Sequence, residues 1–240
     1  MSLRYTVLDM LDNISLRLLT TRYIVGRRKL DYQPLPWVGI GASRRAIGSQ
    51  DRMLAINGLL DQYNPEINVG LDVGCNVGYF SLSLKERGYK VFGVDNNGKY
   101  LRIAEIAGRK ISQGSFSGIN VTIDENNVDY LPKSDVTICL SIWHHWVKHY
   151  GLRSATDILV TLHSNTKHIL LFETGENEMP SSYGLPFSDG DPRIWIEDYF
   201  MDLFPMSTIN WLGSYSAFPP EHSEQDKDVK RNLFAIIKGK

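Results

Sequence analysis

The sequence has 240 residues, of which 42% are hydrophobic and 22% are charged, and its formal net charge is −1. This length suits one α/β domain with an N-terminal extension, and the near-neutral charge gives no overall electrostatic attraction to nucleic acid. The two cysteines have no metal-type spacing and imply no disulfide framework, which favours a reducing, cytoplasmic setting.

Residues 1–66 are predicted to form a helical extension with a loop. Arg27, Arg28 and Lys29 follow a segment with helical spacing. One interpretation is a helix packed on the main domain. The alternative is a helix at a membrane surface, because an apolar stripe with a basic cluster is typical of interfacial helices, although acidic residues interrupt this one. The apolar stripe comprises Val7, Leu8, Leu11, Ile14, Leu18 and Leu19.

A loop rich in proline and glycine comes next, and from residue 67 onward strand-like and helix-like segments alternate. This alternation predicts a parallel sheet with right-handed crossovers, and the lack of a helix between the last two strands predicts an antiparallel final strand. The expected helices are Ser49–Tyr63, Tyr79–Arg87, Lys99–Ile111, Leu152–His163 and Arg193–Phe204. The expected strands are residues 69–73, Lys90–Asp95, Ile119–Ile123, Asp135–Ile142, His168–Glu173, Ser207–Tyr215 and Leu233–Ile237.

The first of these strands leads into a glycine loop with the pattern Asp72-x-Gly74-x-x-x-Gly78. Glycine lets the backbone approach a ligand closely, and the loop opens a helix whose free N–H groups favour polar ligand atoms. The second strand ends in Asp95, and an acid at that point commonly accepts the two hydroxyls of a ribose. The pattern therefore predicts a nucleoside-cofactor site at the carboxyl edge of the sheet.

The loop lacks the middle glycine of the dinucleotide fingerprint, because Asn76 stands there, and this disfavours a nicotinamide dinucleotide. The chain resembles the class I S-adenosylmethionine-dependent methyltransferases from about residue 68 to its C-terminus. The resemblance is carried by Leu-Asp-Val-Gly-Cys-Asn-Val-Gly-Tyr-Phe at 71–80, Val-Phe-Gly-Val-Asp at 91–95 and Asp-Val-Thr-Ile-Cys-Leu-Ser-Ile-Trp-His-His at 135–145.

The resemblance implies a Rossmann-like, seven-stranded, mostly parallel sheet with helices on both faces. It also implies an S-adenosyl-L-methionine-binding domain over residues 67–240. By the same resemblance, Asp72 is expected to orient the glycine loop, and the backbone of Leu140 and Ser141 is expected to line the methionine end of the cofactor. For the adenine, Asn127 and Val128 precede a Leu-Pro pair, and Asp124 competes with them. The positions assigned to the cofactor are Asp72, Gly74, Cys75, Asn76, Gly78, Asp95, Asn96, Asn127, Val128, Leu140 and Ser141.

Three side chains are candidates for catalysis. His144 and His145 follow the fourth strand, where a histidine can act as general base because its pKa lies near neutrality. Glu173 ends the fifth strand, and strand ends on this edge face the ligand crevice. A metal site is disfavoured, because only His145 and His149 share a helical face.

The sequence therefore predicts an S-adenosylmethionine-dependent methyltransferase that acts on a small-molecule or glycan-type acceptor, at oxygen. One alternative is a tRNA- or RNA-modifying transferase of the same fold, which the charge does not favour. Another is a non-catalytic cofactor-binding protein. Acceptor specificity is expected in Tyr32–Gly48 and in Glu176–Pro192, which we expect to form a lid. The sequence does not fix the oligomeric state.

Overall fold

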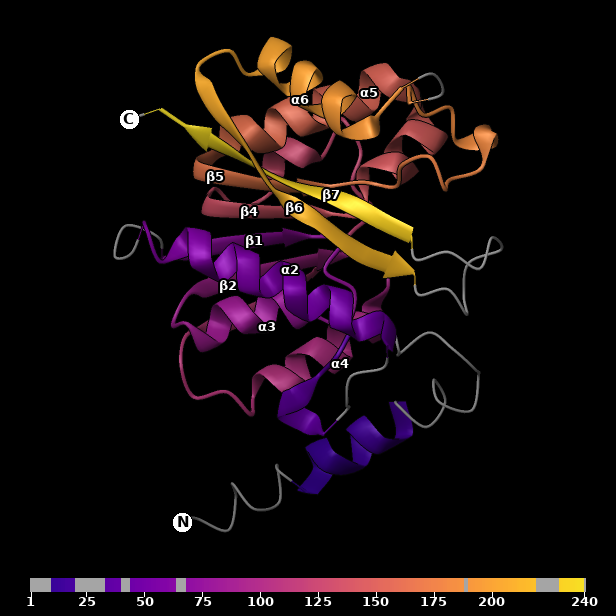
Figure 1. Cartoon of the computed structure of the whole chain (residues 1–240). Coiled ribbons are helices and arrows are strands. Elements are labelled where there is room, and N and C mark those ends of the chain that lie inside the picture. Colours follow the sequence, from indigo (N-terminus) through magenta and orange to yellow (C-terminus); the bar gives the residue numbers. More distant parts are fainter. Residues whose placement is uncertain are drawn as a thin grey trace.

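The computed structural model describes residues 10–19, 33–39, 44–63, 68–187, 190–218 and 229–239. In these ranges a seven-stranded sheet lies between two layers of helices (Figure 1). The strand order is β3-β2-β1-β4-β5-β7-β6, and β7 runs antiparallel to both of its neighbours. The mostly parallel sheet and its antiparallel final strand are thus confirmed. The strands are β1 (Val69–Val73), β2 (Lys90–Asp95), β3 (Ser115–Asn120), β4 (Ser134–Leu140), β5 (Thr166–Glu173), β6 (Ser207–Phe218) and β7 (Val229–Lys238).

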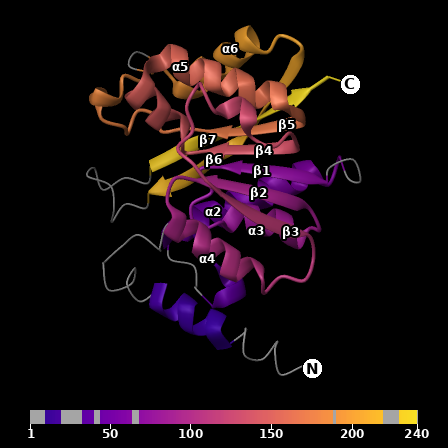
Figure 2. The same cartoon turned by 180° about the vertical axis from the view of Figure 1, so that it is seen from behind.

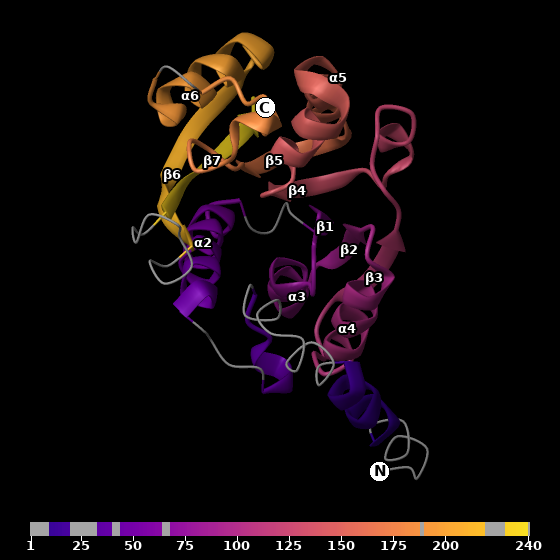
Figure 3. The same ribbon diagram turned by 90° about the vertical axis from the view of Figure 1, so that its right-hand side faces the viewer.

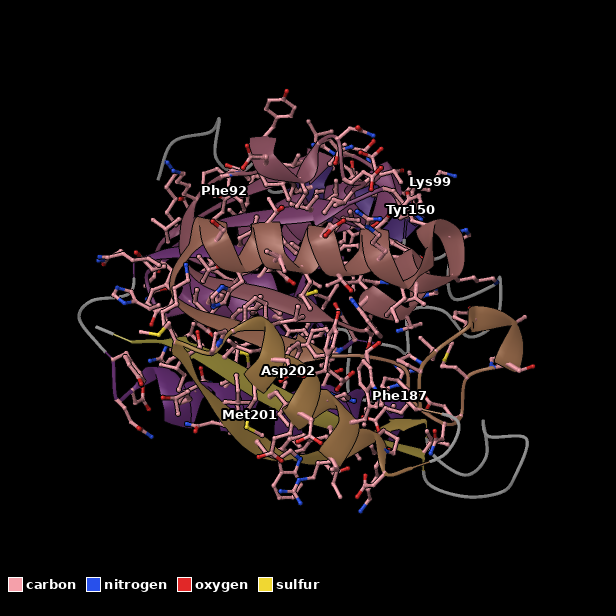
Figure 4. The ribbon with its side chains drawn as sticks, turned by 90° about the horizontal axis from the view of Figure 1, so that it is seen from above. Phe92, Lys99, Tyr150, Phe187, Met201 and Asp202 are labelled. Carbon is pink, nitrogen blue, oxygen red and sulfur yellow. The ribbon has the colours of Figure 1, made fainter. Side chains whose placement is uncertain are left out.

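Helices cover both faces of the sheet, as expected. They form two layers, one on each side of the sheet (Figures 1 and 2). Figure 4 looks onto the two-helix face, where Met201 and Asp202 lie on α6. The first layer comprises α2 (Arg44–Leu60), α3 (Tyr79–Glu86) and α4 (Gly98–Gly108), and the second comprises α5 (Trp143–Asn165) and α6 (Pro192–Leu203). Short 3₁₀ turns occur at η2 (Pro36–Val38), η3 (Val128–Tyr130) and η4 (Ser181–Tyr183).

Four elements begin four or more residues earlier than the sequence pattern predicts, namely α2, β3, α5 and β7. Helix α5 starts at Trp143 rather than Leu152, with a non-helical Gly151 (φ 84°) inside it. Strand β3 starts at Ser115 rather than Ile119, with Gly118 within it. The longer α5 places the histidine pair on its first turn.

The core lies on both faces of the sheet because successive strand residues point to opposite sides. In β5, Leu170 and Phe172 face α5 and α6, whereas Ile169 and Leu171 face α2 and α3. Burial on both faces explains why the central strands are nearly continuous apolar runs. Helix α2, which belongs to the expected extension, contributes Met53, Ile56, Leu59 and Leu60 to the second of these clusters.

The N-terminal helix over residues 10–19 packs beside α4 at the end of the helical layer (Figures 1 and 3). Leu16 and Leu19 lie in a cluster with residues of α3 and α4. Leu11, Ile14 and Leu18 are exposed, so only part of the apolar stripe packs on the main domain. Val7 and Leu8 lie outside the described residues.

Candidate active site

A cavity of about 510 Å³ opens at the carboxyl edge of β1, β2, β4 and β5, the edge that Figure 3 faces. It brings together most of the side chains that the motifs predict. The predicted residues among its lining are Asp72, Gly74, Asn76, Asp95, Leu140, Ser141, His144, His145 and Glu173. The predicted residues that are described but do not line it are Cys75, Gly78, Asn96, Asn127 and Val128.

The glycine loop bends sharply between β1 and α3. Gly74 (φ 75°), Asn76 (φ 53°) and Gly78 (φ 89°) all adopt left-handed backbone conformations, which glycine tolerates without strain. A Cβ atom on Gly78 would lie 2.7 Å from the Cβ of Ala104. Gly78 therefore permits the close packing of α3 against α4, while Gly74 lines the cavity itself.

Asp95 is held at the tip of β2 by two backbone donors. One carboxylate oxygen accepts the N–H of Asn76 at 2.9 Å, and the other accepts the N–H of Asn97 at 2.8 Å. Each carboxylate oxygen has a second lone pair. A rigidly oriented carboxylate with one free acceptor position on each oxygen is suited to two neighbouring hydroxyl groups, such as those of a ribose.

Asp72 is buried near the end of β1, where the hydroxyl of Ser81 donates to it at 2.6 Å. Burial raises the pKa of Asp72 to about 7, even though the hydrogen bond from Ser81 acts in the opposite direction. The amide oxygen of Gln33 accepts the N–H of Tyr79 at 3.1 Å, so the N-terminal segment reaches the start of α3.

Both residues predicted to contact the adenine take part in local structure. The side chain of Asn127 accepts the N–H of Asp124 and donates to the carbonyl of Thr122, at 3.0 and 2.9 Å. Val128 is buried in the hydrophobic core. The adenine assignment to these two residues therefore stays a prediction.

A buried polar network connects β4, β5 and β7 at the other end of the cavity. The Glu173 carboxylate forms an ion pair with Arg52 and accepts the hydroxyl of Ser141 at 2.7 Å. Arg231 donates to the same hydroxyl at 2.9 Å and to Glu178 at 2.7 Å. Ser141 has a left-handed φ of 58°, and its N–H donates to the carbonyl of Glu173 at 2.8 Å. The network thus fixes the strained residue at the end of β4.

The histidine pair lies on the first turn of α5 with its rings 4.3 Å apart. Nδ1 of His144 accepts the N–H of Gly175 at 2.8 Å, so the neutral ring carries its proton on Nε2. Burial, followed by the charges of Arg231 and His145, lowers the pKa of His144 to about 2. His145 is half-buried, and its pKa is lowered chiefly by burial. Both rings lie 5.9 Å from the ring of Tyr183.

The motifs do not predict several lining residues that come from distant segments. Both loops in which acceptor specificity was expected contribute to the lining. The first supplies Gln33, and the second supplies Met179 and Tyr183. Arg52 of α2 and Arg231 of β7 carry no sequence signal for the site, because tertiary packing alone brings them to the cavity. The further lining residues are Ser49, Phe80, Tyr100, Ile142 and Ala217.

Comparison with known proteins agrees with this geometry. Residues 71–159 match the family described as "Methyltransferase domain". The O-antigen chain terminator bifunctional methyltransferase/kinase WbdD of Escherichia coli is 28% identical over 134 residues, which are 53% of this chain and 18% of that protein.

Solved structures share the fold. The bifunctional kinase-methyltransferase WbdD superposes with a TM-score of 0.67 and 21% identity, covering 92% of this chain and 45% of that one. The magnesium protoporphyrin IX methyltransferase ChlM from Synechocystis PCC 6803, crystallised with bound S-adenosylmethionine, has a TM-score of 0.60 and 16% identity. The superposition covers 95% of this chain and 97% of the ChlM chain. The chain spans less than half of the WbdD chain.

The sheet order, the glycine loop and the acid on β2 define a Rossmann-like protein with a nucleoside-cofactor cavity. The match of residues 71–159 to a methyltransferase domain and the shared fold agree with the resemblance of this chain to the class I S-adenosylmethionine-dependent methyltransferases.

Proposed function

We propose that this protein transfers the methyl group of S-adenosylmethionine to a hydroxyl oxygen of a glycan or small-molecule acceptor. The observation that carries the proposal is the continuous cavity that joins Asp95 and the glycine loop to the histidine wall. The cofactor supplies an activated methyl group, so the protein needs mainly to align the acceptor with it and to exclude water.

The cofactor-side residues have distinct duties in this proposal. Asp95 accepts the ribose hydroxyls, while the backbone at Leu140 and Ser141 borders the methionine end. Asp72 presents a carboxylate toward the positive charge of the methionine part. Tyr100, which follows Asp95 on the first turn of α4, offers a ring that can pack against the nucleoside.

Two observations favour the acceptor class. The ring of Tyr183, beside the imidazoles, is the kind of aromatic surface against which a sugar ring packs. The related WbdD is described as an O-antigen chain terminator, and we extend a glycan acceptor from that protein to this chain. An RNA acceptor is less favoured because the chain carries 26 basic and 27 acidic residues.

Calorimetry with S-adenosylhomocysteine tests the cofactor assignment. Asp95→Ala removes the charged acceptor proposed for the ribose hydroxyls and should weaken binding by about 1.5–3 kcal/mol, about 10- to 150-fold in Kd. Asp202→Ala, on the outer surface of α6, is the matched control and should bind normally (Figure 4). Unchanged affinity in a folded Asp95→Ala protein, or tighter binding of NAD, argues against the assignment.

An acceptor screen tests the rest of the proposal. The protein is incubated with methyl-labelled S-adenosylmethionine and, separately, with oligosaccharides, small hydroxylated compounds and tRNA. Label in an oligosaccharide or small alcohol supports the proposal, whereas label in tRNA alone supports the RNA-modifying alternative. Cofactor binding with no transfer to any acceptor supports the non-catalytic alternative.

Cofactor affinity should also depend on pH through Asp72. Its pKa is about 7 in the free protein, and a cationic ligand favours the ionised carboxylate. Binding at lower pH must therefore expel a proton, so affinity should rise from about pH 6 to about pH 8 and then level off. Calorimetry across this range measures the effect, and Asp72→Asn should flatten it. An equally steep profile in Asp72→Asn would assign the titration to another group.

A further inference from the structure

The N-terminal helix over residues 10–19 has two chemically different faces. One face packs on the body of the protein through Leu16, which is 7% exposed and lies among α3 and α4 side chains. Asp12 points to the same side, where both of its oxygens accept hydrogen bonds from Arg109 at 2.7 Å. The guanidinium of Arg109 lowers the pKa of Asp12, which keeps the pair ionised.

The other face is apolar and exposed. Met10, Leu11, Ile14 and Leu18 are 64%, 53%, 44% and 65% exposed. At 100° per residue these four positions fall within one stripe about 100° wide. Asp12 lies on the opposite side, so it does not interrupt the stripe. Asp12, one of the acidic residues that weakened the membrane interpretation, therefore fastens the helix to Arg109 at the end of α4.

The charge of the surrounding segment is positive although the protein as a whole is not. Residues 1–32 contain six basic and three acidic residues, whereas the remaining 208 contain 20 basic and 24 acidic residues. In the part of the chain that the structure describes, no helix is long and apolar enough to cross a membrane. An apolar stripe on one face of a helix is typical of helices that lie along a bilayer surface.

We infer that the outer face of the 10–19 helix is a docking surface for an anionic lipid membrane. The exposed leucines insert among the acyl chains, and the basic residues of the first 32 positions attract the lipid headgroups. A second copy of the chain fits this face poorly. Two segments of the same positive charge would meet there, and four side chains offer far less than the roughly 800 Å² per partner of a stable interface.

Flotation of the full chain with lipid vesicles tests this inference without using catalytic activity. The protein should float with vesicles of phosphatidylcholine and phosphatidylglycerol and much less with phosphatidylcholine alone. Leu11→Asn with Leu18→Asn should lower the partition coefficient at least about tenfold, because burial of one leucine contributes about that factor. Leu54→Asn is the matched control, since Leu54 is 69% exposed on α2, away from this helix, and should float normally.

A second variant tests the electrostatic contribution to membrane binding. Arg27→Gln, Arg28→Gln and Lys29→Gln together should weaken binding to anionic vesicles, and added salt should do the same. Circular dichroism confirms that each variant is folded. Binding that ignores both the leucines and the lipid charge overturns the inference. The inference is also overturned if the protein binds no vesicles and light scattering shows a dimer that Leu18→Asn converts to a monomer.

Discussion

His145→Ala should lower kcat by about 10²–10⁴, the usual contribution of a general base, while leaving cofactor affinity unchanged. Nδ1 of His144 accepts the N–H of Gly175, whereas among the described residues no hydrogen bond is made to the ring of His145. The remaining nitrogen of His144 carries its proton and can donate but not accept. We therefore assign removal of the proton of the acceptor hydroxyl to His145.

His144→Ala should behave differently from His145→Ala. It leaves the buried N–H of Gly175 without its acceptor, which should cost about 1–3 kcal/mol of stability. Thermal unfolding and steady-state kinetics on both variants separate the two roles. His149→Ala is the matched control, because His149 is exposed one turn further along α5. If His145→Ala turns over at the wild-type rate, His145 is not a general base, and orientation of the acceptor alone accounts for the reaction.

The pH profile gives a second readout of the same assignment. Burial, followed by the charges of His149, Arg231 and Lys148, lowers the pKa of His145 from its ordinary value of 6.5. A general base works in its neutral form, so kcat should rise with pH through a pKa below 6.5 and be flat at neutral pH. In His145→Ala this rise should disappear from the remaining activity.

The parts of the site that sequence alone predicted are those encoded in short, contiguous motifs. The loop at Gly74, the acid at Asp95 and the end of β4 at Ser141 all follow directly from a strand into a turn, and each lies on the cavity. The seven-stranded sheet was predictable for the same reason, because its central strands are apolar runs with turn residues between them.

Residues that reach the cavity through tertiary packing were not predictable in this way. Gln33 arrives from a segment before the first strand, and Arg52 from a helix that packs on β6 and β7. The two-faced N-terminal helix shows the same limit. Its spacing predicts a helix, but tertiary contacts, namely the packing of Leu16 and the pairing of Asp12 with Arg109, decide which face turns inward.

Glu173→Ala should destabilise the protein by about 3–5 kcal/mol, because it leaves Arg52 as a buried, unpaired charge. Glu173 is 1% exposed, and its oxygens are used by Arg52 and by the hydroxyl of Ser141. Both carboxylate oxygens already have partners within the protein. We therefore expect Glu173 to act by positioning Ser141 at the methyl-donor end of the cavity.

A double-substitution cycle separates this positioning role from a catalytic one. Arg52→Met should be destabilised like Glu173→Leu, while the double variant should recover stability, because apolar side chains can replace a buried ion pair. Glu173→Gln keeps an oxygen acceptor for Ser141 and should retain much of the turnover at a temperature where it is folded. Loss of turnover in a stable Glu173→Gln protein with normal cofactor affinity would instead make Glu173 the proton acceptor.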